Sequence, residues 1–140
     1  MEQISARPIK KGKQIRAFFC VKDEIVRLPF FYQYYRQLGV TEFFAIDNDS
    51  TDGSQQYLID QPDTHVFLTK QKYNESNAGR DWTSKLCNQY GTDQWCLTLD
   101  VDEFLVYPYS EQIPLDIFCN YLDKHSFQGV YCIFLDMYSD

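Results

Sequence analysis

Three carboxylates stand between two apolar runs in the segment WCLTLDVDEFLVYP, residues 95–108. They belong to Asp100, Asp102 and Glu103. A buried carboxylate without a partner is costly, so such a cluster is usually paired with a positive group. Residues two apart in an extended segment point to the same side, so Asp100 and Asp102 can face one ligand. Hard oxygen donors suit Mg²⁺ or Mn²⁺, whose other ligands are commonly water and phosphate oxygens. We therefore predict a divalent metal at Asp100 and Asp102, with a diphosphate as its partner.

The cysteines and histidines do not favour a zinc site or a thiol site. The five cysteines are widely spread and include no C-x-x-C pair, and His65 and His125 are isolated from each other. Cysteine within apolar segments behaves as a small hydrophobic residue. We therefore expect reduced, mostly buried thiols, and histidines that are ordinary surface or core residues.

Length and composition indicate one globular domain. The chain has 140 residues, of which 44% are hydrophobic and 17% aromatic. A net charge of -7 argues against a general nucleic-acid-binding protein, which needs a basic face. Basic residues cluster in RPIKKGKQIR, residues 7–16, and we interpret residues 1–14 as a solvated lead-in to a domain of residues 15–140. No apolar run approaches the roughly 18 residues of a membrane span.

Strand and helix patterns alternate along the chain. The expected strands are residues 14–21, 42–47, 65–70, 94–100 and 129–138, and the expected helices are residues 28–39, 54–61, 77–91 and 114–125. Strands separated by helices imply right-handed crossovers. The predicted fold is therefore α/β, with a mostly parallel sheet flanked by helices.

Polar loops follow three of these strands: KDE at residues 22–24, DNDSTDGS at residues 47–54 and DVDE at residues 100–103. The carboxyl ends of parallel strands meet at one edge of the sheet, where ligands of such folds bind. On its own, STDGS is better explained as a turn and helix cap, because Asp, Ser and Gly are ordinary capping residues. Three such loops at one edge favour a binding site, because each carries more carboxylate than capping requires.

The combination of DNDSTDGS with LDVDEFL, together with CVKDE after the first strand, resembles the nucleotide-sugar half of family 2 glycosyltransferases. The resemblance covers residues 16–138 and implies a Rossmann-like GT-A fold. The related family pattern reads VDDGSTDGS, so Asp47 keeps its place, whereas Asn48 stands where a second Asp is commoner. An Asn brings no charge, which leaves the preferred nucleotide base open.

The resemblance also implies roles for individual residues. Those implied to bind the nucleotide sugar are Val21, Lys22, Asp23, Glu24, Asp47, Asn48, Arg80 and Asp100. Among them, Asp23 and Glu24, with the main chain of residues 20–22, would border the base and ribose. Asp47 and Asn48 would contact the base.

The remaining implied roles concern the diphosphate and its metal. Arg80 would lie near the diphosphate, and Lys85 is a weaker second candidate. Asp100 and Asp102 are the implied metal ligands, with Asp102 the direct one. Glu103 either supports the metal site or caps the turn.

The implied activity is metal-dependent, inverting transfer of a sugar from a nucleotide diphosphate donor to an acceptor hydroxyl. The cofactor would be Mn²⁺ or Mg²⁺, the donor most commonly a UDP-sugar, and the acceptor a glycan or glycoconjugate of a cell-surface polysaccharide pathway. The expected location is the cytoplasm or the inner face of the membrane.

The resemblance places the general base and the acceptor pocket well beyond the acidic motif, and only 38 residues follow Asp102. We therefore expect a fragment cut before the acceptor half, which binds nucleotide, transfers sugar poorly and exposes apolar surface that favours self-association. The catalytic residue is unassigned.

Two other classes of function remain open. One is a non-catalytic nucleotide- or protein-binding module of the same fold. The other is a different metal-dependent phosphoryl enzyme, such as a nucleotidyltransferase or a haloacid-dehalogenase-like phosphatase. A nucleotidyltransferase of similar fold would show a Gly-rich basic loop after its first strand, which CVKDEIVRLP lacks. The phosphatase would carry its paired acids after the first strand rather than the fourth.

Overall fold

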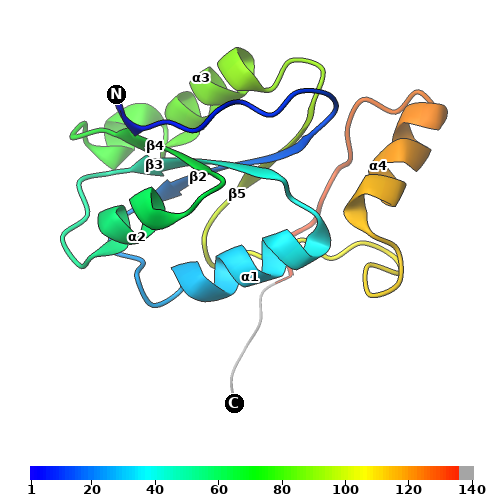
Figure 1. The fold of residues 1–140 in the computed structure, drawn as a ribbon, viewed down its shortest axis with the longest axis horizontal. Helices are drawn as coiled ribbons and strands as arrows, with labels where there is room; N and C mark the ends of the chain where they lie inside the picture. Colours follow the sequence, from blue (N-terminus) through cyan, green and yellow to red (C-terminus); the bar gives the residue numbers. More distant parts are fainter. Residues whose placement is uncertain (136–140) are drawn as a thin grey trace.

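A computed structural model describes residues 1–135 of the chain and shows a five-stranded mixed sheet between helices (Figure 1). The strands are β1 (Glu2–Ser5), β2 (Ile15–Val21), β3 (Glu42–Asp47), β4 (Thr64–Leu68) and β5 (Trp95–Leu99). Their order in the sheet is β1-β4-β3-β2-β5, with β2 to β5 parallel and β1 antiparallel to β4. The predicted α/β class and mostly parallel sheet are confirmed.

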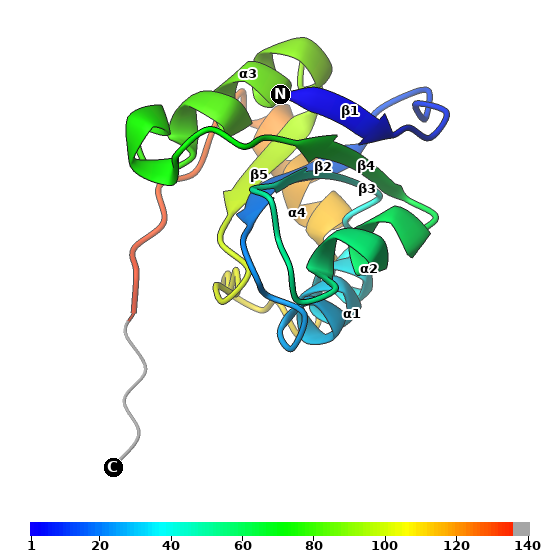
Figure 2. The same cartoon turned by 90° about the vertical axis from the view of Figure 1, so that its left-hand side faces the viewer.

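Four α-helices connect or flank these strands: α1 (Leu28–Leu38), α2 (Ser54–Asp60), α3 (Arg80–Tyr90) and α4 (Leu115–Lys124). Figure 2 shows α1 and α2 on one face of the sheet and α3 on the opposite face. Each face has its own apolar core, and α4 contributes to the core on the side of α1. Among residues 1–135, no helix is long and apolar enough to cross a membrane.

The order of the strands reverses at β2. Strands β3 and β4 follow on one side of β2, whereas β5 returns to its other side after the crossover through α3. In open α/β sheets, such a reversal leaves a crevice at the carboxyl ends of the two strands on either side of it. The ends of β2 and β5 are therefore the place where a ligand is expected.

Helix α1 forms as its sequence predicts. Pro29 lies in its first turn, and Gly39 ends it with a φ of 114°, a left-handed conformation that glycine adopts without strain. Phe31, Tyr32 and Tyr35 are buried against the sheet, so most of the aromatic run packs within the domain.

Tyrosines of α1 also hold the chain just after the acidic motif. The hydroxyl of Tyr34 donates to the carbonyl oxygen of Leu105 at 2.7 Å, and that of Tyr35 donates to the carbonyl oxygen of Glu103 at 3.0 Å. The Leu105 N–H donates back to the Tyr35 hydroxyl at 3.0 Å. These bonds anchor residues 103–105 to α1, whose inner face is buried, and so fix the position of the chain just after the acidic loop.

Most of residues 1–14 are exposed, as expected, but they are not a lead-in separate from the domain. Residues 2–5 form β1, which pairs with the edge of β4. The Arg7 guanidinium donates to the carbonyl oxygens of Ile59 at 2.5 Å and Gln61 at 3.1 Å. The sequence EQIS carries too few apolar residues to predict a strand, and β1 exists because the open edge of β4 supplies hydrogen-bond partners.

The strand predicted at residues 129–138 is not present in residues 129–135, and residues 136–138 lie outside the described part of the chain. The segment runs apart from the sheet (Figure 2), with Tyr131 and Ile133 almost fully exposed. An apolar, β-branched run is compatible with a strand, but a strand forms only where a neighbour completes the hydrogen-bond ladder. In residues 1–135 the only ladder partner of β5 is β2.

The cysteines are less buried than expected. All five are free thiols. Cys119 is buried, Cys20 and Cys87 are half-buried, and Cys96 and Cys132 are exposed. Exposure of Cys132 follows from the missing strand, because the apolar segment that carries it has no sheet to pack against.

A buried ionic cluster joins β2, β3 and β4. The Arg16 guanidinium donates through Nε to Oε2 of Glu42 at 2.7 Å, and both residues are about 5% exposed or less. The main-chain N–H of Lys10 donates to Oε1 of the same carboxylate at 2.8 Å. His65 lies beside them with Nε2 3.7 Å from Glu42 Oε1, too far for a hydrogen bond.

We expect the free energy of unfolding to fall as the pH drops below about 6.5, the ordinary pKa of histidine. Burial lowers the pKa of His65, and the Glu42 carboxylate opposes this only in part. The unfolded chain therefore takes up a proton at a pH where folded His65 stays neutral, so stability present above pH about 6.5 is lost on acidification. Urea titrations of the unaltered chain and His65→Gln between pH 7.5 and 5 measure this. An equally steep loss in the variant would contradict it.

Candidate functional site

A cavity of about 300 Å³ lies at the carboxyl ends of the strands. Its lining residues are Cys20, Val21, Lys22, Glu24, Asn48, Tyr73, Asp100, Val101 and Asp102. They come from the last two residues of β2 and from the segments that follow β2, β3, β4 and β5, so all three polar loops singled out in the sequence reach one place. The cavity lies where the strand order reverses, as the topology leads one to expect.

The acidic turn at the end of β5 presents two free carboxylates. Val101 between them is buried and fixes the turn to the core. The side chains of Asp100 and Asp102 accept no hydrogen bond from any residue in the described range 1–135. Glu103 is different, because its Oε2 accepts the N–H of Asp100 at 3.2 Å and so caps the turn. Of the two roles left open for Glu103, the geometry favours the cap.

The two free carboxylates influence each other electrostatically. Partial burial raises the pKa of Asp100 above its ordinary value, and the negative charge of Asp102 raises it further. The positive charge of Arg80 opposes both effects. Two carboxylates that repel each other and lack hydrogen-bond donors make a favourable place for a cation.

Hydrogen bonds join the KDE and STDGS loops to each other. Oδ1 of Asp23 accepts the N–H of Thr51 at 2.7 Å, and Oδ2 of Asp52 accepts the N–H of Ile25 at 2.9 Å. The Ser54 hydroxyl accepts the N–H of Glu24 at 2.8 Å. Asp23 thus braces the loop and does not line the cavity, and STDGS has the structural role expected of it alone.

Asp47 and Asn48 differ in what they reach. Asp47 is fully buried, and its carboxylate accepts a hydrogen bond from Gln55 Nε2 at 2.8 Å, so it holds the turn after β3 and does not line the cavity. Asn48 lines the cavity while its amide donates to the carbonyl oxygens of Thr69 at 3.0 Å and Gln71 at 2.9 Å. Of this pair, only Asn48 is placed to meet a ligand.

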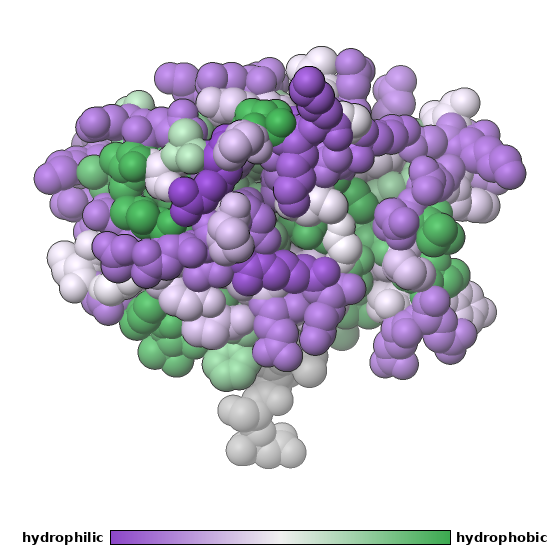
Figure 3. Space-filling model, viewed as in Figure 1, coloured by the Kyte–Doolittle hydropathy of each residue, from purple (hydrophilic) through white to green (hydrophobic). Residues whose placement is uncertain are grey.

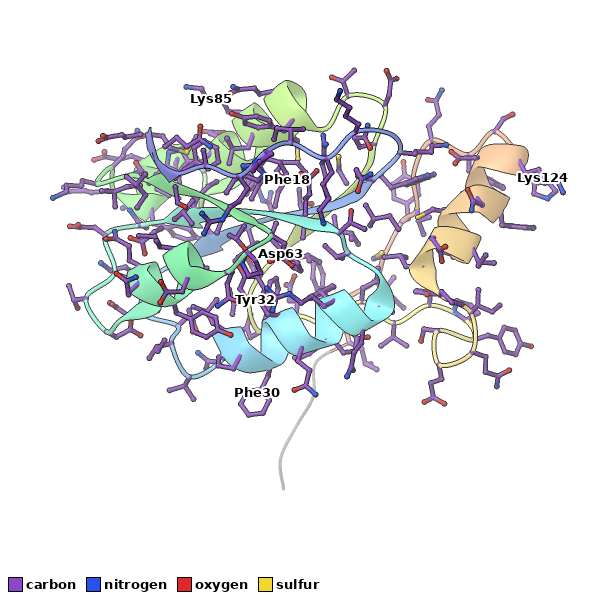
Figure 4. All side chains as sticks on the ribbon, in the orientation of Figure 1. Phe18, Phe30, Tyr32, Asp63, Lys85 and Lys124 are labelled. Atoms are coloured by element: carbon purple, nitrogen blue, oxygen red, sulfur yellow. The ribbon has the colours of Figure 1, made fainter. Side chains whose placement is uncertain are left out.

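The two basic candidates on α3 also differ. Arg80 begins the helix and does not line the cavity. Burial raises the pKa values of both Asp100 and Tyr73, and the positive charge of Arg80 is close enough to oppose this in part. Lys85 lies further along α3 and points away from the sheet (Figure 4). Arg80 therefore remains a candidate for contact with an anionic ligand, whereas Lys85 does not.

Tyr73 and Cys20 line the cavity although the sequence did not single out their side chains. Tyr73 follows β4 in a short 3-10 helix (η1, Tyr73–Ser76), is 45% exposed and packs against Trp82 with ring centroids 6.3 Å apart. The signal in the sequence that could have identified Tyr73 is its position as a lone aromatic residue after a strand, at the edge of the sheet where the polar loops meet. Burial raises the pKa of the Cys20 thiol to about 12, so this group stays protonated and neutral.

The donor set fits a cation that keeps ligands from outside the protein. Within residues 1–135 no three His, Cys, Asp or Glu side chains are grouped so as to hold a metal ion. Two carboxylates alone suit Mg²⁺ or Mn²⁺, which complete their coordination with water and phosphate oxygens. A closed zinc site needs more protein ligands than the cavity offers.

Compared with protein-family models, curated proteins and solved structures, the chain gives no match. The function of the chain must therefore be inferred from the residues at the cavity.

Proposed function

We propose that this chain holds the donor-binding site of a metal-dependent glycosyltransferase with a GT-A-like fold. The observation that carries the proposal is the pair of free carboxylates, Asp100 and Asp102, at the end of β5 beside the carboxyl end of β2. A nucleotide sugar joins a base, a ribose, a diphosphate and a sugar, and the cavity offers a suitable group for the first three.

The base and ribose would lie between Tyr73 and the loop after β2. The exposed ring of Tyr73 offers a stacking surface, and Asn48 lines the same cavity with a polar side chain. Lys22 and Glu24 come from the loop that Asp23 and Ser54 hold in place. Few polar groups on a partly apolar wall are typical of small-ligand sites.

The diphosphate would lie toward the acidic turn. Asp102 and Asp100 would hold Mn²⁺ or Mg²⁺ there, and the cation would supply the positive charge that stabilises a leaving diphosphate. Arg80 would add a second positive charge from the start of α3. The net charge of the chain is -7, so a diphosphate without a cation would meet two unscreened carboxylates.

The transfer itself exchanges one bond for another. The oxygen of the acceptor hydroxyl forms a bond to the anomeric carbon, and the bond from that carbon to the phosphate oxygen breaks. The electron pair of the broken bond leaves with the diphosphate, and the hydroxyl proton passes to a carboxylate acting as general base. We expect the base outside the residues of this cavity.

A thermal-unfolding panel tests the proposal. Uridine, guanosine and cytidine diphosphates are added separately to the chain, each with Mn²⁺ and with EDTA. We expect one of them to raise the Tm only with the metal, since a ligand at 100 times its Kd stabilises the folded state by about 2.7 kcal/mol. A shift that persists in EDTA, or no shift with any diphosphate, would contradict the proposal.

A further inference from the structure

A second cavity, of about 330 Å³, lies on the other side of Asp102. Its lining residues are Arg27, Phe30, Val101, Asp102 and Phe104, and we call it the Phe30 pocket. Val101 and Asp102 line both cavities, so the acidic turn is a shared wall. A molecule in the Phe30 pocket would therefore lie next to whatever Asp102 holds.

Two exposed aromatic rings dominate the Phe30 pocket. Phe30 projects from α1 away from the sheet (Figure 4) and is 65% exposed. Phe104 is 50% exposed. Apolar side chains gather on the surface at the start of α1 (Figure 3), where Val26 is also exposed. The Phe104 ring packs edge-on against Tyr34, with centroids 4.9 Å apart, so α1 supports both rings. Exposed phenylalanines beside a carboxylate indicate a binding surface rather than core packing.

The charges of the pocket select against an anion. The guanidinium of Arg27 is already paired, because its Nη1 donates to Oε2 of Glu24 at 2.6 Å. Asp102, in contrast, accepts no hydrogen bond from residues 1–135. An anionic ligand would meet one compensated cation and one free carboxylate, whereas a neutral ligand with hydroxyl groups would give Asp102 the donors it lacks.

We propose that the Phe30 pocket is the acceptor subsite and that it binds a neutral pyranose ring. The apolar C–H face of such a ring would pack on Phe30 and Phe104, and its hydroxyl groups would donate to Asp102. One carboxylate can serve both cavities because its two oxygens offer about four acceptor positions. This inference rests on the proposed function, and it places the acceptor next to the donor across a single turn.

The inference is tested by titrating methyl β-D-glucopyranoside, methyl β-D-galactopyranoside and methyl N-acetyl-β-D-glucosaminide into the ¹⁵N-labelled 140-residue chain. Neither metal nor nucleotide is added. We expect weak, saturable shifts of the amide signals of Arg27, Phe30 and Phe104 with at least one glycoside. Phe30→Ala should weaken this binding about tenfold, the loss of roughly 1.4 kcal/mol of ring contact, and Phe30→Trp should retain it. Tyr121→Ala, which removes another exposed ring from α4, should leave it unchanged.

Octyl phosphate serves as the competing probe. Glycosides that shift no signal, or that shift signals away from the Phe30 pocket, would overturn the inference. So would octyl phosphate shifting Arg27, Phe30 and Phe104 while the glycosides do not, because the pocket would then take an anionic amphiphile. UDP with Mn²⁺ is titrated into Phe30→Ala in parallel. Retained UDP binding with lost glycoside binding supports the subsite, whereas failure of the unaltered chain to bind any of the uridine, guanosine and cytidine diphosphates counts against the proposed function alone.

Discussion

Replacing Asp102 by Asn is expected to weaken the Mn²⁺-dependent binding of a nucleoside diphosphate about 100-fold, the equivalent of about 3 kcal/mol for one charge-assisted contact. The side chain is exposed and makes no hydrogen bond within residues 1–135, so the substitution should leave the fold intact. Because the diphosphate would be held through the cation, loss of the carboxylate should reduce the affinity to the level seen with EDTA. Calorimetric titration of both proteins measures the difference.

The matched control is Asp116→Asn, which removes the same charge from the exposed start of α4. It should bind like the unaltered chain. Asp102→Asn should also lower the pKa of Asp100, because the neighbouring negative charge that raises it is gone. Unchanged affinity in Asp102→Asn, together with a lowered pKa of Asp100, would show that the two carboxylates are neighbours but do not hold the metal.

Replacing Glu42 by Ala is expected to lower the free energy of unfolding by about 3–5 kcal/mol, the effect of breaking a buried ion pair from one side. Arg16 would keep a guanidinium that is 5% exposed and has lost its carboxylate. The N–H of Lys10 would lose its acceptor as well. Urea unfolding followed by circular dichroism gives the free energy of each variant.

Two further variants show whether the buried charge is the cause. The double variant Arg16→Met with Glu42→Leu removes both charges and should recover much of the loss, because apolar residues of similar volume fill the site. Glu75→Ala breaks an exposed pair with Lys72 and should change stability by at most about 0.5 kcal/mol. Equal losses in Glu42→Ala and Glu75→Ala would contradict the assignment.

The parts of the fold that the sequence predicts are those whose pattern is local. The sequence of helix α1 contains the helical spacing of apolar residues, Pro29 in the first turn and Gly39 at the end. The helix begins and ends where these residues predict. Strand β1 and residues 129–135 show the opposite, because a strand depends on its neighbour as well as on its own residues. EQIS becomes a strand at the open edge of β4, whereas the more apolar GVYCIFL does not become one.

The sequence predicts where the candidate site lies better than it predicts the role of each residue there. Parallel strands bring the three polar loops together, and that expectation needs only the order of the elements. Asp23 and Asp47 could not be told from ligand-binding residues, because a carboxylate that braces a turn and one that meets a ligand look the same in a sequence. Tyr73 and Phe30 depend on where a side chain points after packing, which no spacing rule supplies.

The central claim is that the acidic turn after β5 holds a divalent cation and, through it, a nucleoside diphosphate. The most direct measurement is calorimetric titration of uridine diphosphate into the unaltered chain, first with Mn²⁺ and then with EDTA. Saturable binding with the metal that disappears with EDTA is the predicted result. Binding of neither Mn²⁺ nor the nucleotide would contradict the claim, and the paired carboxylates would then be only a turn at the end of the sheet.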